Sequence, residues 1–441
     1  MAVTETVVLR ARSMARAGFS PGAAALALAV PFLFLHIKYQ PGVRVPLGST
    51  HLGLELSDVA IVVVALVALR EGLQSGFAPL RPALPLWVAS VALILWIVVR
   101  SGSLVHFVTA AKFSEYALLA FSAPLILRRR PDWELVAAAT VAWSVVATAF
   151  GLLQFLGVNM ADAWAAGRRQ PSFLGHSDFA ALSALALGIG LAVVLLTGRR
   201  IGWTAVASGG LGLILSGATA GLIGIAAGTA AFLYAVSRRR KLGVRDFAVS
   251  AAVVGVVAAG VLVLRAGDFE NFLRFVHLKG KETQTANIQT YSHHALLAYI
   301  GYRIWRDHPI VGAGWQASTD PAIVDPELPA AHRKFPDVAP LAFPTREHEW
   351  GIQNAYIQAA ADLGLIGLVL WLAPFALALV LALRANAPPG AVAVFTILAA
   401  MGIWGGQGLV AGIPLDATTW LGFGLAGTAV AQRSRTPSQG K

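Results

Sequence analysis

Long apolar runs separated by short polar segments follow one another along most of the chain. A helix needs about 20 largely apolar residues to cross about 30 Å of hydrocarbon. The runs that approach this length predict roughly twelve transmembrane helices. They lie near residues 21–37, 56–70, 84–99, 104–126, 134–157, 177–197, 201–216, 219–236, 246–266, 352–382, 390–406 and 414–432. This pattern predicts an all-α integral membrane protein.

The division of residues 201–236 decides the direction of every later helix. This uncharged run is too long for one span and short for two, and the sequence SGATAG begins at Ser216. Because serine and glycine favour tight turns, we place a break there. Without that break, all helices after it would run in the opposite direction.

Composition and charge agree with a membrane protein. Apolar residues make up 57% of the chain and charged residues 13%, whereas soluble domains carry about 25% charged residues. The net charge of +12 could suggest a nucleic-acid partner. The basic residues instead form short clusters between apolar spans, which is the positive-inside pattern, so we expect no nucleic acid.

The clusters also predict an orientation, with both termini in the cytoplasm of a multi-pass protein in the cytoplasmic (inner) membrane. The segments expected inside contain Arg10, Arg12, Arg16, Arg70, Arg81, Arg128 to Arg130, Arg199, Arg200, Arg238 to Arg240, Lys241, Arg245, Arg384, Arg433, Arg435 and Lys441. The short outer loops contain only Lys38, Arg44, Arg100, Arg168 and Arg169.

The sequence lacks cysteine and a recognisable signal-peptide cleavage site, which limits the possible chemistry and the way the chain is targeted. Cysteine is missing, which excludes disulfides, thiolate catalysis and zinc sites built on cysteine. The first apolar run, from Pro21 to Leu35, continues into HIKYQPG without a small-residue cleavage site. It is therefore expected to be a retained first helix rather than a signal peptide.

A polar insertion at residues 267–351 interrupts the apolar pattern between the ninth and tenth spans, and the topology places it outside. It contains six histidines between His277 and His348. The segment HHALLAYIGYRIW, from His293, has the spacing of an amphipathic helix at a membrane surface. We expect nine spans in residues 1–266, an extracytoplasmic loop with short surface helices in residues 267–351, and three spans with a cytoplasmic tail in residues 352–441.

Two outer arginines precede a helix that opens with polar residues. Arg168 and Arg169 come shortly before His176 and Asp178. Since the arginines break the positive-inside bias, two interpretations stay open, namely forked contacts with phosphate oxygens and snorkelling to lipid headgroups. Asp178 is equally explained as an acid at a helix N-terminus. His176 is a candidate for substrate binding.

The insertion contributes a second group of candidates. Arg303 precedes His308, which we interpret as a structural turn residue beside Pro309. Arg346 and His348 belong to the charged segment TREHEW, just before the tenth span. Surface solvation explains such a cluster, whereas phosphate binding or a base role would explain its place at the mouth of a membrane cavity.

Polar groups also lie within the spans. Gln353 and Asn354 stand at the outer end of the tenth span, where free helix N–H groups favour anions. Asp362 is about two turns deeper and is costly unless it faces the bundle interior. In the fourth span, Lys112 and Glu115 are three positions apart, so we expect them to pair on one helical face.

The order of several short motifs resembles that of a known family. Gln353, Asn354, Gly364 and Gly367 fit the pattern of an amide or histidine, asparagine, nine residues, glycine, two residues, glycine. This pattern resembles the signature of the O-antigen ligase and O-antigen polymerase family, membrane glycosyltransferases of the C type. DHPIVGAGWQAS, RQPSFLGHSDFAALSALAL and LELSDVAIVVVALVALR resemble further family segments. About twelve spans with one large outer loop also fit this family.

The resemblance implies transfer of a glycan from a polyprenyl-pyrophosphate carrier to a hydroxyl acceptor, on a lipid or a glycan, without metal or other cofactor. Membrane lipids would be further partners. Because the departing pyrophosphate needs positive charge, we expect Arg169 to stabilise it. Arg168, Arg303 and Arg346 are expected to assist, and the remaining substrate-binding candidates are His176, Gln353 and Asn354.

Two departures from the family pattern concern the base. The ligases carry histidine where this chain has Gln353, which cannot act as a base. Many relatives carry an arginine where the ungapped register places His294. We expect His348 to take the base role, with His294 as the alternative, and orientation of the acceptor alone stays open. We expect the two signature glycines to let a neighbouring helix approach closely.

Two other classes of protein also stay open. About twelve spans and buried charges would suit a secondary transporter, although the sequence shows no paired interrupted helices in matching halves. A non-catalytic relative that binds lipid-linked glycans is compatible with the missing histidine. Ligase and polymerase activities share the same kind of donor and differ in the acceptor, so both are carried forward.

Overall fold

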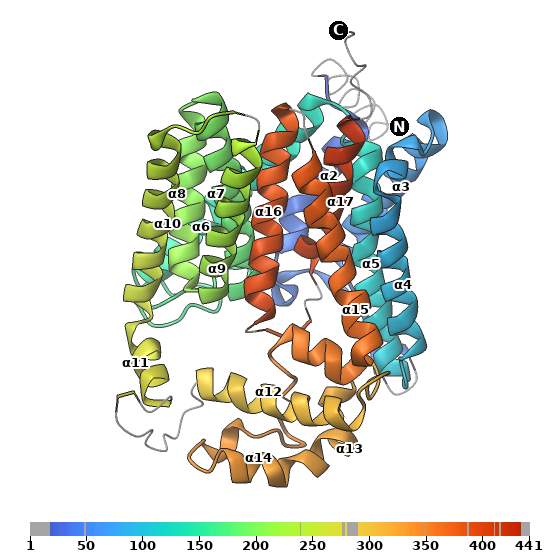
Figure 1. Ribbon diagram of the computed structural model, residues 1–441, viewed down its shortest axis with the longest axis vertical. Coiled ribbons are helices and arrows are strands. Elements are labelled where there is room, and N and C mark those ends of the chain that lie inside the picture. The colour runs from blue at the N-terminus through green and yellow to red at the C-terminus, as the bar shows by residue number, and fades with distance from the viewer. Residues whose placement is uncertain are drawn as a thin grey trace.

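A bundle of helices along one axis carries a smaller helical layer across one of its ends (Figure 1). This computed structural model describes residues 18–47, 50–238, 240–275, 278–279, 290–348, 350–385, 388–409, 411–413 and 416–433. Both termini, His277 and Glu349 lie outside these residues. We call the end of the bundle that carries the smaller layer the insertion end.

Each predicted apolar span corresponds to one helix of the bundle. These helices are α2 (Pro21–Phe34), α3 (Leu56–Ser75), α4 (Leu84–Val99), α5 (Leu104–Ile126), α6 (Arg130–Phe155), α7 (His176–Thr197), α8 (Ile201–Ser216), α9 (Thr219–Ser237), α10 (Val244–Leu264), α15 (Ala355–Arg384), α16 (Pro388–Gly408) and α17 (Ala417–Arg433). Among the described residues, eight helical segments are long and apolar enough to cross a membrane, and α2 and α8 are shorter apolar helices. The chain is therefore a multi-pass membrane protein, and twelve as the number of spans stays a prediction.

The break placed within residues 201–236 is present in the structure. Helix α8 ends at Ser216, and Gly217 adopts the left-handed conformation with φ of 61°. Glycine suits this position because it has no Cβ to strain the backbone. Helix α9 begins at Thr219, runs back toward the opposite end of the bundle and packs mainly against α16 (Figure 1).

Helix α7 lies at the centre of one half of the bundle, where every residue from Phe179 to Ala192 is buried. Small residues allow its neighbours to come close. A Cβ added to Gly209 of α8 would lie 2.4 Å from the carbonyl oxygen of Ser183. A central helix that is apolar on all sides is expected to be buried in this way.

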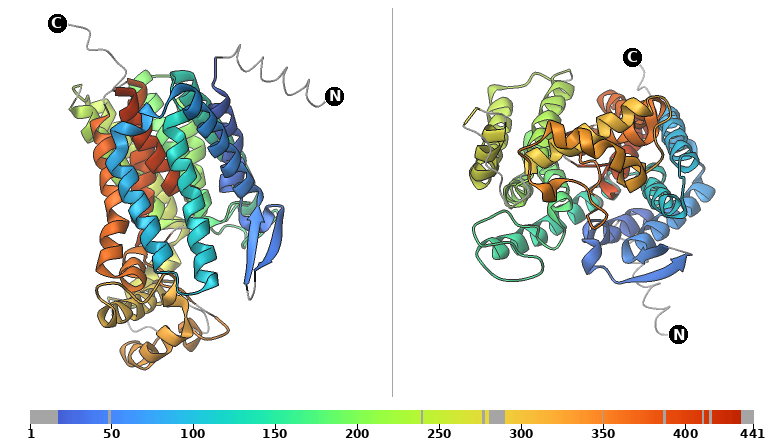
Figure 2. Two further views of the ribbon diagram at one scale, coloured as in Figure 1. Left: turned by 90° about the vertical axis from the view of Figure 1, so that its right-hand side faces the viewer. Right: turned by 90° about the horizontal axis from the view of Figure 1, so that it is seen from below.

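A short hairpin accompanies the helices of the predicted all-α architecture. Strands β1 (Gly42–Leu47) and β2 (Thr50–Glu55) pair antiparallel between α2 and α3. Figure 2 shows the hairpin at the side of the bundle. Val43 and Val45 alternate with Arg44 in β1, which is the period of a strand. A count of long apolar runs does not detect strands of six residues each.

The insertion folds around an apolar core of its own. Its helices are α11 (Ala266–Phe275), α12 (Thr290–Asp307), α13 (Pro321–Val324) and α14 (Leu328–Lys334). Helix α12 confirms the predicted amphipathic helix and crosses the end of the bundle (Figure 1). Its apolar residues Leu296, Leu297 and Ile300 are buried against the insertion and α15. The apolar face is thus covered by protein, and the position of α12 at a membrane surface stays a prediction.

Candidate functional site

Helix α15 is interrupted at Gly364, one of the signature glycines, where φ is 70° and ψ is −170°. Such a break leaves backbone groups without helical partners. The segment from Pro309 to Gly314 supplies them. The N–H of Leu365 donates to the Pro309 carbonyl at 2.9 Å, and the N–H of Gly314 donates to the Asp362 carbonyl at 2.8 Å. Two motifs far apart in sequence therefore form one junction.

The glycines of this junction are required by close backbone contact. A Cβ added to Gly364 would lie 2.2 Å from the Ile310 carbonyl oxygen, so its close neighbour is the insertion rather than the expected helix. At Gly367, an added Cβ would clash first with the side chain of Leu363 in the same helix, and it would lie 3.0 Å from Trp96 Nε1 of the neighbouring helix α4. The spacing of the signature thus specifies the interrupted helix.

Asp362 is fully buried within the junction and links three segments. Its Oδ1 accepts a hydrogen bond from the N–H of Ser318 at 2.9 Å, and its Oδ2 accepts one from Gln358 Nε2 at 3.2 Å. Gln358 Oε1 in turn accepts from the N–H of Ile413 at 2.7 Å. Asp362 faces the protein interior, as expected, and these bonds give it a structural role.

Asn354 and Gln353 act through different groups at the start of α15. Asn354 Oδ1 caps the helix by accepting from the N–H of Ile357 at 3.0 Å. The main-chain carbonyl of Gln353 lies 3.4 Å from His294 Nδ1. Since a carbonyl can only accept, this contact assigns the proton of the neutral imidazole to Nδ1 and the lone pair to Nε2. Burial lowers the pKa of His294 below its ordinary value.

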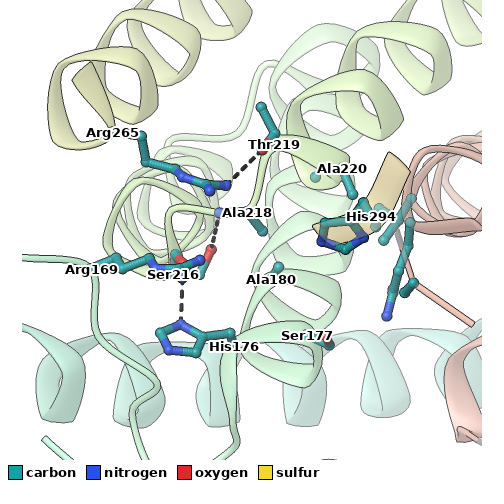
Figure 3. A pocket seen from close by; sticks show the side chains of 14 residues that line it. Arg169, His176, Ser177, Ala180, Ser216, Ala218, Thr219, Ala220, Arg265 and His294 are labelled. Carbon is teal, nitrogen blue, oxygen red and sulfur yellow. Dashed lines mark hydrogen bonds between the residues drawn. The ribbon is translucent and has the colours of Figure 1, made fainter. Parts of the chain in front are cut away.

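A pocket of about 130 Å³ lies beside these residues, at the insertion end of the bundle (Figure 3). It is lined by the start of α7 and the loop before it, the turn between α8 and α9, the residue that follows α10, α12, and the last part of α16 with the segment after it. Its polar lining consists of Arg169, His176, Ser177, Ser216, Thr219, Arg265, His294 and Gln407.

Arg265 is the principal residue of this pocket that the sequence analysis missed. It is buried, and its Nε contacts Asp268 Oδ2 at 2.7 Å. Its NH1 donates to the carbonyl of Gly217 at 3.2 Å and to Thr219 Oγ1 at 2.8 Å. Arg265 stands at the end of an apolar run, where a charged residue commonly marks the end of a membrane span. Like Arg169, however, it lies at the end where the positive-inside rule predicts few cations, and that signal could have identified it.

Arg169 and His176 are held on the opposite wall from α12. The guanidinium carbon of Arg169 lies over the ring of Trp164, 4.5 Å from its centre. His176 Nδ1 lies 3.3 Å from the carbonyl oxygen of Ser216, and its ring meets Trp164 nearly edge-on. The contact with Ser216 again assigns the proton to Nδ1 in the neutral ring.

Two helix N-termini add to the positive potential of the pocket. Helices α7 and α9 both begin there, and among the described residues neither has a side-chain cap. Free N–H groups and the positive end of the helix dipole favour an anion. Together with Arg169 and Arg265, they make this pocket a candidate site for phosphate oxygens.

The structure brings together Arg169, His176 and His294 and leaves other candidates outside the pocket lining. His348 and Arg346 are exposed, and the N–H of Thr345 donates to the His348 carbonyl at 3.0 Å in a turn. The ring of His348 stacks on Trp350 with centroids 5.8 Å apart.

The remaining cationic candidates are exposed or paired at some distance from the pocket. Arg168 is exposed, and Arg303 forms an ion pair with Glu327 inside the insertion. Lys112 lies 3.9 Å from Glu115, which confirms the expected pair. Two carboxylates at the start of α3 lie closer to Lys112, namely those of Asp58 and Glu55. The Glu55 Oε2 atom is 3.0 Å from Lys112 Nζ. This group joins α3 to α5.

The fold and the pocket define a multi-pass membrane protein with a candidate anion site at one end of its bundle. Residues 204–372 match the family model described as O-antigen ligase. The matched segment contains Arg265, His294 and the junction around Gly364, while Arg169 and His176 precede it. This match supports the resemblance to the O-antigen ligase and O-antigen polymerase family over these residues. No curated protein matches the chain.

Proposed function

We propose that this protein is a membrane glycosyltransferase that moves a glycan from a polyprenyl-pyrophosphate carrier to a hydroxyl acceptor. The observation that carries the proposal is the convergence of Arg169, Arg265 and two uncapped helix starts on one pocket. The reaction would take place at the outer face of the cytoplasmic membrane, because the predicted topology puts the insertion end outside. Ligase and polymerase activity both fit this site.

The proposed chemistry requires positive charge on one side of the reacting carbon. The bond between the anomeric carbon and the pyrophosphate oxygen breaks, and a bond from the acceptor oxygen to that carbon forms. Negative charge develops on the departing pyrophosphate, where Arg169 and Arg265 would stabilise it. The acceptor hydroxyl loses its proton in the same step, so a base beside the acceptor accelerates transfer.

His294 is the base that the geometry favours. It lines the same pocket as the two arginines, and Figure 3 draws it across the pocket from Arg169 and His176. Burial lowers its pKa, so the imidazole is neutral at physiological pH, as a base must be. The carbonyl of Gln353 orients the ring with the Nε2 lone pair available. Gln353 would thus support a neighbouring histidine through its main chain instead of acting as the base itself.

The test is a transfer reaction with the purified protein in lipid nanodiscs. An undecaprenyl-pyrophosphate-linked glycan is incubated with lipid and glycan acceptors, and both carrier release and glycan transfer are measured. We expect transfer by the wild type and a loss of at least about 100-fold in Arg265→Ala, since removing a group that stabilises developing charge costs about that much. Arg346→Ala, which alters an exposed arginine outside the pocket, serves as the matched control and should retain activity.

The same experiment separates the other two classes. Binding of the donor without carrier release would identify a non-catalytic relative. Movement of intact lipid-linked glycan across a sealed vesicle, again without release, would identify a transporter. The interruption of α15 does not itself favour transport, because the segment from Pro309 to Gly314 fills the break with the protein's own backbone.

A further inference from the structure

Trp164 contacts two of the side chains that line the pocket. It lies in the loop between α6 and α7, with its ring centre 4.5 Å from the Arg169 guanidinium carbon and 4.5 Å from the His176 ring centroid. The Trp164 side chain is 42% exposed. A tryptophan this exposed is only partly held by core packing, so its contacts with the pocket and its own loop must account for its position.

Gln170 fixes this loop to the bundle. It is fully buried, and its Oε1 accepts a hydrogen bond from the N–H of Trp164 at 2.8 Å. Its Nε2 donates to the carbonyls of Ala165 and Arg168, each at 3.1 Å. Its own N–H donates to the carbonyl of Leu215 in α8 at 2.8 Å. The backbones that carry Trp164 and Arg169 are therefore held by one residue.

A second contact ties the loop to the segment that follows α2. Asp162 accepts from Lys38 Nζ at 2.6 Å and from the Tyr39 hydroxyl at 2.7 Å. These hydrogen bonds lower the pKa of Asp162, so its carboxylate stays ionised. The indole is thus presented on a loop that is anchored on both sides of Trp164.

The stacking has a chemical consequence for Arg169. A guanidinium has two flat faces and an edge that carries its five N–H donors. An aromatic ring attracts the face, whereas the edge is the part of a guanidinium that makes bidentate contacts with phosphate oxygens. We propose that Trp164 is a positioning residue that holds Arg169 with its donor edge toward the pyrophosphate. This inference rests on the proposed function, which makes the pocket the pyrophosphate site.

The test is equilibrium binding of undecaprenyl pyrophosphate to the full-length protein in lipid nanodiscs. A cation–π contact is worth about 2- to 30-fold in affinity, so Trp164→Leu should weaken binding by that factor. Trp164→Phe keeps an aromatic face and should retain more affinity than Trp164→Leu. Trp203→Leu is the matched control, because Trp203 is 44% exposed and lies about 20 Å along α8 from the pocket.

A double-mutant cycle separates positioning from general stability. In an Arg169→Ala background, Trp164→Leu should cause no further loss, because there is no guanidinium left to position. An equal loss in both backgrounds would show a merely structural role and overturn the inference. Equal affinity of Trp164→Leu and wild type would overturn it as well while leaving the proposed function intact. Failure of the wild type to bind would overturn the proposed function, and the inference with it.

Discussion

At the scale of single residues, the candidate site combines groups that the sequence could and could not identify. Arg169 was recognisable because it breaks a charge rule for membrane proteins. His294 was only an alternative to His348, since the sequence contains no distance between an imidazole and the start of α15. The structure adds that distance, 3.4 Å from His294 Nδ1 to the Gln353 carbonyl oxygen. The choice between the two histidines therefore depended on tertiary contacts.

His294→Ala is expected to reduce turnover by about 10²- to 10⁴-fold, the usual contribution of acid–base catalysis. His348→Ala alters an exposed turn residue and should leave turnover near the wild-type value. Turnover is measured in the transfer reaction at saturating donor. The opposite ranking would return the base role to His348, and nearly unchanged turnover in both variants would favour activation by orientation alone.

The pH dependence of turnover tests the same assignment. Burial lowers the pKa of His294, so its base form persists at a lower pH than that of an ordinary histidine. Activity should fall as the pH decreases through the lowered pKa and should be constant just above it. The measurement is a pH profile of kcat for the wild type beside His348→Ala. An acid limb at or above the ordinary histidine pKa of about 6.5 would contradict a role for buried His294.

Lysine and alanine substitutions at Arg265 and Arg169 should separate the contribution of positive charge from that of guanidinium geometry. Lysine keeps the charge but loses the planar fork, so Arg169→Lys should retain part of the activity and Arg169→Ala very little. Arg265→Lys should be more damaging than Arg169→Lys, because the Arg265 fork also bonds to Gly217, Thr219 and Asp268. Activities are compared at equal amounts of folded protein. Full activity of Arg169→Ala would reduce that residue to a headgroup contact.

At the scale of elements, apolar length predicts helices well and their interruptions poorly. The predicted spans at 84–99, 104–126 and 201–216 coincide with α4, α5 and α8, because lipid and packing both require continuous apolar runs. The break in α15 could not be seen in this way, since Asp362 and Gly364 interrupt hydropathy only slightly. It depends on a partner segment in the insertion, which is information that a local pattern does not contain.

Gly364→Ala is expected to destabilise the protein strongly. The backbone conformation at this position costs about 1–3 kcal/mol for other residues, and the new Cβ would lie 2.2 Å from the Ile310 carbonyl oxygen. Gly102→Ala is the matched control, since an added Cβ there has no atom within 4 Å among the described residues. Thermal unfolding in detergent is the measurement. Equal Tm values for the two variants would show that the junction is not needed for stability.

At the scale of the whole molecule, the remaining prediction is orientation, and the absence of cysteine makes it accessible. Ala322 of α13 is exposed at the insertion end, and Ser237 is exposed where α9 ends, at the opposite end of the bundle (Figure 1). A single cysteine at Ala322 should react with an impermeant reagent in intact cells, whereas one at Ser237 should react only after lysis. The physical reason is the bias of basic clusters toward the end opposite the insertion. The reverse labelling pattern would place the pocket on the cytoplasmic side, where the proposed reaction would meet a different pool of carrier and acceptor. The chain turns between α8 and α9 at Gly217 as predicted. The reverse labelling pattern would therefore mean that the charge rule fails for this protein, rather than that the break was misplaced.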